Sequence, residues 1–167
     1  MDEIKKQLDE AFSWAQKDDY DKALALCNAV IQANPSIPDG LRKRATIYAR
    51  MGDYDRAIAD ITNVMAQEPD DPSHHFFRGW WYLDDGNPAQ AVEDLTKALA
   101  LGEKNNHYHD ESAHFFRAAA LLRLRRYDEA LADCQHVRDD FLIYIKSAGK
   151  ISKADILREA TAGKSKG

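Results

Sequence analysis

Apolar and small residues recur along this chain with a helical period, and the whole pattern returns after 34 residues. Ala23, Ala57 and Ala91 are 34 residues apart, and Ala130 follows Ala91 after 39. Around these alanines the apolar residues stand three and four positions apart, which places them on one face of a helix. A fixed period of this length predicts a solenoid built from repeated helical units.

Glycine, proline and acidic residues divide each repeat into two helices. Gly52-Asp53 and Gly86-Asn87 can supply a positive φ and an N-cap inside a repeat, whereas Pro35 and Pro69 end the second helix. We expect first helices over about 4–17, 38–51, 72–85 and 110–124, and second helices over about 20–33, 54–67, 88–101 and 127–138.

Two positions of every repeat hold only Ala or Gly, as expected where two helices approach most closely. Numbered from Ile4, Pro38, Pro72 and Glu111, they are position 8 (Ala11, Ala45, Gly79, Ala118) and position 20 (Ala23, Ala57, Ala91, Ala130). With an aromatic residue at position 11 (Trp14, Tyr48, Tyr82), Tyr at 17 and Pro at 32, the pattern resembles the tetratricopeptide repeat. The resemblance implies an all-α fold, a right-handed α-solenoid of four antiparallel helix pairs with a C-terminal capping helix.

The repeats are expected over about 4–37, 38–71, 72–110 with a loop insertion, and 111–140, followed by a capping segment and basic tail over 141–167. Ser152 and Asp155 have the spacing of a capping box, which predicts a helix over about 153–161. A solenoid end exposes apolar surface, and this helix is the candidate to cover it. The apolar run 141–145 is compatible with helix or with extended chain.

Arginine and aspartate recur together at positions 7 and 23 of repeats two to four. The residues are Arg44, Arg78 and Arg117, and Asp60, Asp94 and Asp133. We interpret them as a ladder of ion pairs between first and second helices, in preference to a functional site. Arg125-Arg126 stand where Gly and Asp are usual, so the inner turn of repeat four is expected to be built differently.

The net charge of −5 argues against nucleic-acid binding, which needs a basic face to neutralise phosphates. No run approaches 18 apolar residues, and the N-terminus has no apolar signal segment, so we expect no membrane span and a cytoplasmic location. Cys27 and Cys134 fall at the same position of distant repeats and are expected to be buried thiols in a reducing compartment.

The sequence indicates no catalytic machinery and no cofactor. It contains no Gly-rich phosphate loop, no nucleophile elbow and no paired metal ligands on one helix. His107, His109 and Asp110 lie in the stretch 101–110, which contains the five-residue insertion and where a polar loop is favoured over a metal site. Three other histidines, His74, His75 and His114, stand at helix starts and are interpreted as packing or capping groups.

The resemblance implies that positions 2, 5, 6, 9, 12 and 13 of the first helices line a concave binding face. The candidate partner-binding residues there are Phe12, Arg42, Lys43, Arg50, Phe76, Phe77, Trp80, Phe115, Phe116 and Arg123. Packing between first helices is the favoured interpretation of Phe12, Phe76, Trp80 and Phe115. Phe77 and Phe116, at position 6, are expected to be exposed anchors, with the arginines and Lys43 selecting acidic groups.

These features favour a non-catalytic protein-interaction module, an adaptor that binds a peptide or a partner surface in its groove. Repeats of this family that grip the C-terminal carboxylates of chaperones use Lys, Asn, Asn, Lys and Arg at five set positions. This chain has Leu8, Phe12, Lys43, Ser73 and Phe77 there, so we do not expect that activity. The alternative is a small bacterial immunity or inhibitor protein that neutralises a cognate toxin or enzyme.

Overall fold

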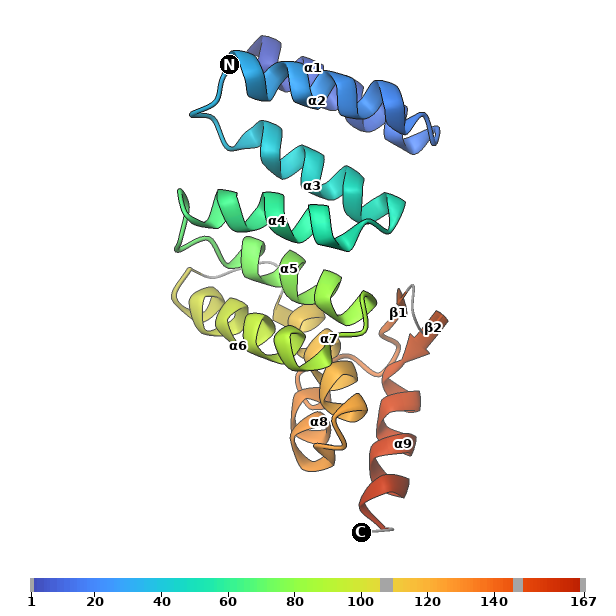
Figure 1. Ribbon diagram of the computed structural model, residues 1–167. Helices are drawn as coiled ribbons and strands as arrows, with labels where there is room; N and C mark the ends of the chain where they lie inside the picture. Colours follow the sequence, from blue (N-terminus) through green and yellow to red (C-terminus); the bar gives the residue numbers. More distant parts are fainter. Residues whose placement is uncertain (1, 106–109, 146–148, 166–167) are drawn as a thin grey trace. The chain divides into compact units, whose positions relative to one another are not determined.

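The computed structural model describes residues 2–105, 110–145 and 149–165, which form helices and one β-hairpin (Figure 1). The elements in chain order are α1 (Asp2–Gln16), α2 (Tyr20–Ala33), α3 (Asp39–Met51), α4 (Tyr54–Met65), α5 (Pro72–Asp84), α6 (Pro88–Asn105), α7 (Asp110–Arg123), α8 (Tyr127–Cys134), β1 (Leu142–Ile145), β2 (Gly149–Ser152) and α9 (Lys153–Lys164). The eight predicted repeat helices are all present near their expected bounds. The all-α solenoid class is therefore confirmed.

The chain divides into two compact units. The N-terminal unit, Met1–Pro69, contains α1 to α4, and the C-terminal unit, Asp70–Gly167, contains α5 to α9 and the hairpin. A hydrophobic core cluster of the N-terminal unit consists of Leu8, Ala11, Ala15, Ala23, Cys27, Val30 and Ile47. The core of the C-terminal unit is larger, and among its fully buried residues are Leu83, Leu95, Phe115, Ile145 and Ile156.

Small residues mark the closest helix contacts, as the sequence predicted. Ala11, Ala45 and Ala118 are fully buried, and so are the four alanines at position 20. Gly79 gives the clearest case, because a Cβ atom there would lie 2.8 Å from Cγ of Leu95 and 3.3 Å from the carbonyl oxygen of Ala91. Close packing of α5 on α6 therefore leaves no room for a larger side chain.

All four inner turns use one left-handed residue at position 15, including the turn predicted to differ. The φ angles are 60° at Asp18, 85° at Gly52, 83° at Gly86 and 59° at Arg125. The inner turn of repeat four, which was expected to be built differently, therefore has the same left-handed backbone at position 15. What differs is the cap, because Asp53 accepts a hydrogen bond from the amide of Arg56 and Arg126 makes no equivalent bond.

The predicted Arg–Asp ladder is confirmed in all three repeats. Each arginine donates two hydrogen bonds to its aspartate, at 2.7 and 2.8 Å for Arg44–Asp60, 2.6 and 2.8 Å for Arg78–Asp94, and 2.8 and 2.6 Å for Arg117–Asp133. Arginines also reach the preceding repeat, since Arg44 bonds Asn28 at 2.6 Å and Arg117 bonds Thr96 at 3.1 Å. The ladder thus ties first helix to second helix and repeat to repeat.

Two histidines extend this ladder in the C-terminal unit. Nδ1 of His75 lies 3.0 Å from Asp94, and Nδ1 of His114 lies 2.7 Å from Asp133. Burial by itself would raise the pKa of Asp94 and of Asp133. Hydrogen bonds from Arg78 or Arg117 and from the histidine outweigh it, so both pKa values are lowered.

The end of α6 and the segment after α8 depart from the repeat pattern. Helix α6 continues to Asn105, so the first residues of the expected insertion loop are helical; His107 and His109 lie outside the described residues. The run 141–145, left open by the sequence, contains strand β1, which pairs antiparallel with β2. Helix α9 begins with the predicted capping box of Ser152 and Asp155.

Helix α9 packs against α8 and α7 (Figure 1). The contact is tight at Gly163, where a Cβ atom would lie 2.3 Å from the ring of Tyr127. Ile156 and Ala160 are fully buried on the same helix. These contacts place α9 against the last helix pair.

Candidate binding surfaces

A groove of about 490 Å³ opens between α1 and α3 in the N-terminal unit. Its apolar lining consists of Ile4, Leu8 and Ile37. Charged and polar side chains from both helices complete it, namely Asp2, Lys5, Asp9, Asp39, Arg42, Lys43 and Thr46. The groove therefore combines an apolar strip with charges of both signs, an arrangement suited to an amphipathic segment.

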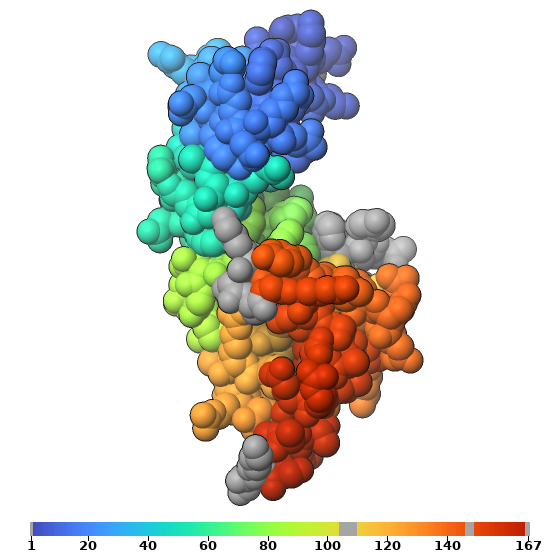
Figure 2. Space-filling model, turned by 90° about the vertical axis from the view of Figure 1, so that its right-hand side faces the viewer, coloured from blue at the N-terminus to red at the C-terminus, as the bar shows by residue number. Residues whose placement is uncertain are grey.

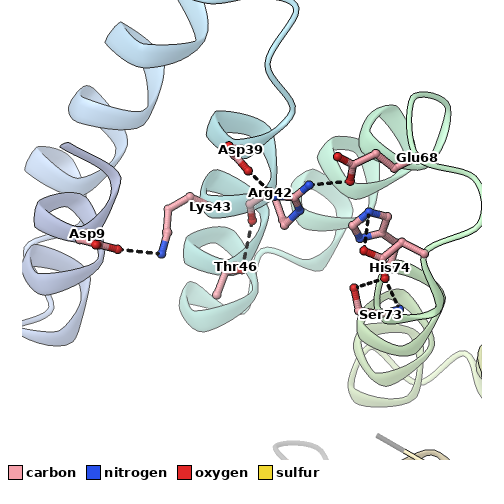
Figure 3. A network of polar contacts seen from close by, with 9 residues as sticks. Asp9, Asp39, Arg42, Lys43, Thr46, Glu68, Ser73 and His74 are labelled. Carbon is pink, nitrogen blue, oxygen red and sulfur yellow. Dashed lines mark hydrogen bonds and ion pairs between the residues drawn. The ribbon is translucent and has the colours of Figure 1, made fainter. Parts of the chain in front are cut away.

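Two neighbouring basic residues of α3 point in opposite directions (Figure 3). Lys43 extends toward α1, where its Nζ lies 3.9 Å from Asp9 and 4.9 Å from the ring centroid of Phe12. Arg42 points the other way and bonds Asp39 and, at 2.5 Å, Glu68. The structure thus brings together Phe12 and Lys43, and it commits Arg42 to two carboxylates of its own unit.

The other two candidate arginines hold neighbouring helices. Nε of Arg50 donates to the carbonyl oxygen of Ala15 at 3.0 Å, and a guanidinium nitrogen of Arg123 donates to that of Leu83 at 2.8 Å. Both arginines occupy position 13, and both carbonyls occupy position 12 of the preceding first helix. Each arginine therefore satisfies a carbonyl at a helix C-terminus, a structural role that the sequence analysis did not foresee.

The aromatic candidates of the C-terminal unit lie mostly in its core. Phe76, Phe115 and Phe116 are 4%, 0% and 4% exposed. The packing interpretation is thus confirmed for Phe76 and Phe115, and the expected exposure of Phe116 is wrong. The ring of Phe116 stacks on Trp80 at 5.1 Å and meets Phe76 edge-on at 5.8 Å, which explains its burial.

Phe77 and Trp80 are half-buried at the edge of this aromatic cluster. Phe77 contacts Phe76 edge-on at 5.3 Å and stacks on Trp81 at 6.1 Å. Its ring is therefore anchored by neighbours on α5 and only partly available to a ligand. The sequence could not separate Phe77 from Phe116, because both stand at position 6.

A second groove, of about 410 Å³, lies between α7, β2 and α9 in the C-terminal unit. It is lined by Ala119, Leu122, Arg123, Lys150, Ile151, Asp155, Ile156 and Glu159. The sequence did not single out any hairpin or α9 residue as a binding candidate. The signal it lacked was the strand conformation of the apolar run, which brings Lys150 and Ile151 beside α7.

Comparison with known proteins supports the repeat architecture. The tetratricopeptide repeat family matches residues 12–79 and again residues 81–140. No curated protein sequence matches the chain significantly. Among the described residues, no helix combines the length and apolar character needed to cross a membrane.

Several solved structures have the same fold. A crystal structure of MamA protein superposes with a TM-score of 0.78 at 20% identity, covering 99% of this chain and 85% of that one. A tetratricopeptide repeat protein from Parabacteroides merdae gives 0.68 at 18% identity, with 82% and 53% covered. The translocator chaperone SycD of Yersinia enterocolitica type III secretion gives 0.66 at 20% identity, with 74% and 96% covered. The family matches, the recurring small residues and the paired helices together show that this chain belongs to the tetratricopeptide repeat family.

Proposed function

We propose that the chain is an adaptor that binds a segment of a partner protein in the α1–α3 groove of its N-terminal unit. The family is generally a non-catalytic protein-interaction fold, which supports a binding role. The observation that carries the specific proposal is the groove itself, an open channel with an apolar strip between charged walls. We propose no catalytic activity, and the cytoplasmic location stays a prediction from the sequence.

The charges of the groove specify what kind of segment it accepts. Arg42 is already engaged by Asp39 and Glu68, so it offers little free charge to a ligand. Lys43 makes a long contact with Asp9 and lies over the ring of Phe12, so no carboxylate holds it closely, and Lys5 is exposed on the α1 side. An amphipathic segment would place an apolar side chain over Leu8 and Ile37 and an acidic group between the two lysines.

Partner capture with a groove-blocking variant tests the proposal. Thr46 is exposed within the groove and bonds only the carbonyl oxygen of Arg42 among the described residues, so Thr46→Arg adds bulk without disturbing the core. Asn63→Arg adds the same side chain at an exposed position of α4, outside the groove, and is the matched control. Proteins retained by the tagged wild-type chain from its native cells are identified by mass spectrometry, and their affinities are then measured.

We expect Thr46→Arg to lower the affinity at least tenfold, a loss of about 1.4 kcal/mol of binding free energy. The affinity of Asn63→Arg should be unchanged. Equal affinity of both variants would place the binding surface elsewhere. Capture of several weak partners favours the adaptor role. Capture of a single toxin or enzyme that loses activity in the complex favours the inhibitor alternative.

A further inference from the structure

The hairpin that precedes α9 carries an apolar strand with an open edge. The side chains of Leu142 and Tyr144 on β1 are 50% and 68% exposed, among the most exposed large apolar residues described. Ile145 on the opposite face is fully buried in the core of the C-terminal unit. Figure 2 shows the hairpin and α9 at the surface of that unit.

The register of the hairpin fixes which backbone groups face outward. The amide of Lys153 donates to the carbonyl of Phe141 at 3.1 Å, so this pair is a hydrogen-bonded pair, and pairs alternate along an antiparallel ladder. The Leu142–Ser152 and Tyr144–Lys150 pairs are then of the non-hydrogen-bonded kind. The amide of Ser152 confirms this parity, because it turns away from β1 to the carboxylate of Asp155.

The outer edge of β1 therefore presents the N–H and C=O groups of Leu142 and Tyr144. Within the described part of the chain these groups have no hydrogen-bond partner. Proteins usually protect such an edge with charged side chains or proline, yet β1 reads Leu-Ile-Tyr-Ile. Strand β2 carries Lys150 and packs against α9, whereas the main neighbour of β1 is β2.

We infer that β1 is a self-association edge, which pairs antiparallel with β1 of a second copy to form a four-stranded sheet across a two-fold axis. With the axis at Ile143, Leu142 stands opposite Tyr144 of the partner copy, and Tyr144 opposite its Leu142. Four backbone hydrogen bonds then form, because the outward groups of these residues face each other. The edge carries no charged side chain, so two copies meet without repulsion, as a self-complementary two-fold contact requires.

The short strand limits the strength of this contact. Four residues and two exposed side chains bury less area than a stable dimer interface of about 1,200 Å² or more. The dimer is accordingly a weak one, in exchange with the monomer. The occupant is a second copy, since the same uncharged edge serves both partners.

Analytical ultracentrifugation over a range of concentrations tests this inference. The wild-type mass should rise with concentration from 18.9 kDa toward twice that value, whereas Leu142→Lys combined with Tyr144→Lys should remain at 18.9 kDa. In the variant, like charges would stand opposite each other across the axis. Leu157→Lys and Met51→Lys are the controls. They replace apolar residues that are 36% and 37% exposed and lie away from β1, so both variants should dimerise as the wild type does.

Cysteine cross-linking tests the register independently. A mixture of Leu142→Cys and Tyr144→Cys proteins should form an intermolecular disulfide, since Cα atoms of such a pair lie about 5.5 Å apart. Either variant alone places its two cysteines diagonally, about 7–8 Å apart, and should cross-link far less. Any of three results would overturn the inference: a wild-type chain that stays monomeric, a lysine variant that dimerises, or equal cross-linking in all samples. A monomeric wild type would indicate that the edge binds another protein.

Discussion

The two units place the same repeat positions in different surroundings. In the N-terminal unit, positions 5 and 6 of α3 hold Arg42 and Lys43, which line an open groove. In the C-terminal unit, positions 5 and 6 of α7 hold Phe115 and Phe116, which are buried among aromatic neighbours. Position in a repeat therefore sets the direction of a side chain, whereas the neighbouring elements decide whether it meets water or protein.

Truncating a phenylalanine should cost more stability in the C-terminal unit, where Phe116 lies in the core, than in the N-terminal unit. We expect Phe116→Ala to lower the free energy of unfolding by about 3–5 kcal/mol, the usual cost of deleting a buried ring. Phe12→Ala in the N-terminal unit should cost clearly less, because Phe12 is half-buried and lies against Lys43. Urea denaturation followed by circular dichroism measures both. Similar losses for the two variants would contradict the contrast between core and groove.

A larger side chain at the small-residue positions should destabilise either unit. Ala57→Leu overpacks a fully buried position of α4 and is expected to cost about 1–3 kcal/mol. Ala59→Leu changes an exposed alanine of the same helix and serves as the control. Thermal melts compare the two variants, and equal midpoints would show that the repeat register is wrong.

Acid should weaken the C-terminal unit through its ladder. The pKa values of Asp94 and Asp133 lie below their ordinary value of 3.8, because Arg and His hydrogen bonds outweigh burial. A lowered folded-state pKa gives stability that is present above the unfolded value and lost as the pH falls through the folded one. Melts between pH 6 and pH 2 should show this loss, and Asp133→Asn should flatten it. If the melting temperature of the wild type does not decrease at pH values below about 4, the ladder does not have this role.

The smallest expected effect concerns the inner turn of repeat four. Arg125 adopts a left-handed φ of 59°, and Arg126 provides no side-chain cap. Arg125→Gly with Arg126→Asp copies the Gly52-Asp53 turn and should stabilise the chain by about 1 kcal/mol. Loss of the exposed Arg126–Glu129 ion pair reduces this gain. A lower melting midpoint than wild type would show that the two turns are not equivalent.

Helix bounds and the ladder could be predicted from the sequence because their signals are local or periodic. Proline and glycine mark the helix ends, and Arg44 and Asp60 return at the same spacing in three repeats. Their contacts are repeated in the structure at nearly the same distances. Such features depend on the repeat itself and little on its neighbours.

Burial of Phe116 and the conformation of 141–145 could not be predicted, because both depend on tertiary neighbours. Phe116 is covered by Trp80 and Phe76 from another helix. The apolar run around Ile143 has no period that separates strand from helix, and its pairing with β2 decides the outcome. The roles of Arg50 and Arg123 were missed for the same reason, since their carbonyl partners lie in the preceding repeat.

Hydrogen–deuterium exchange of the chain, with and without its captured partner, can locate the binding surface on one unit or the other. We expect the partner to slow exchange in α1 and α3, the two helices that line the N-terminal groove, and to leave exchange in α5 and α7 unchanged. Slower exchange confined to α5 and α7 would contradict this expectation, because the binding surface would then lie on the aromatic helices of the C-terminal unit.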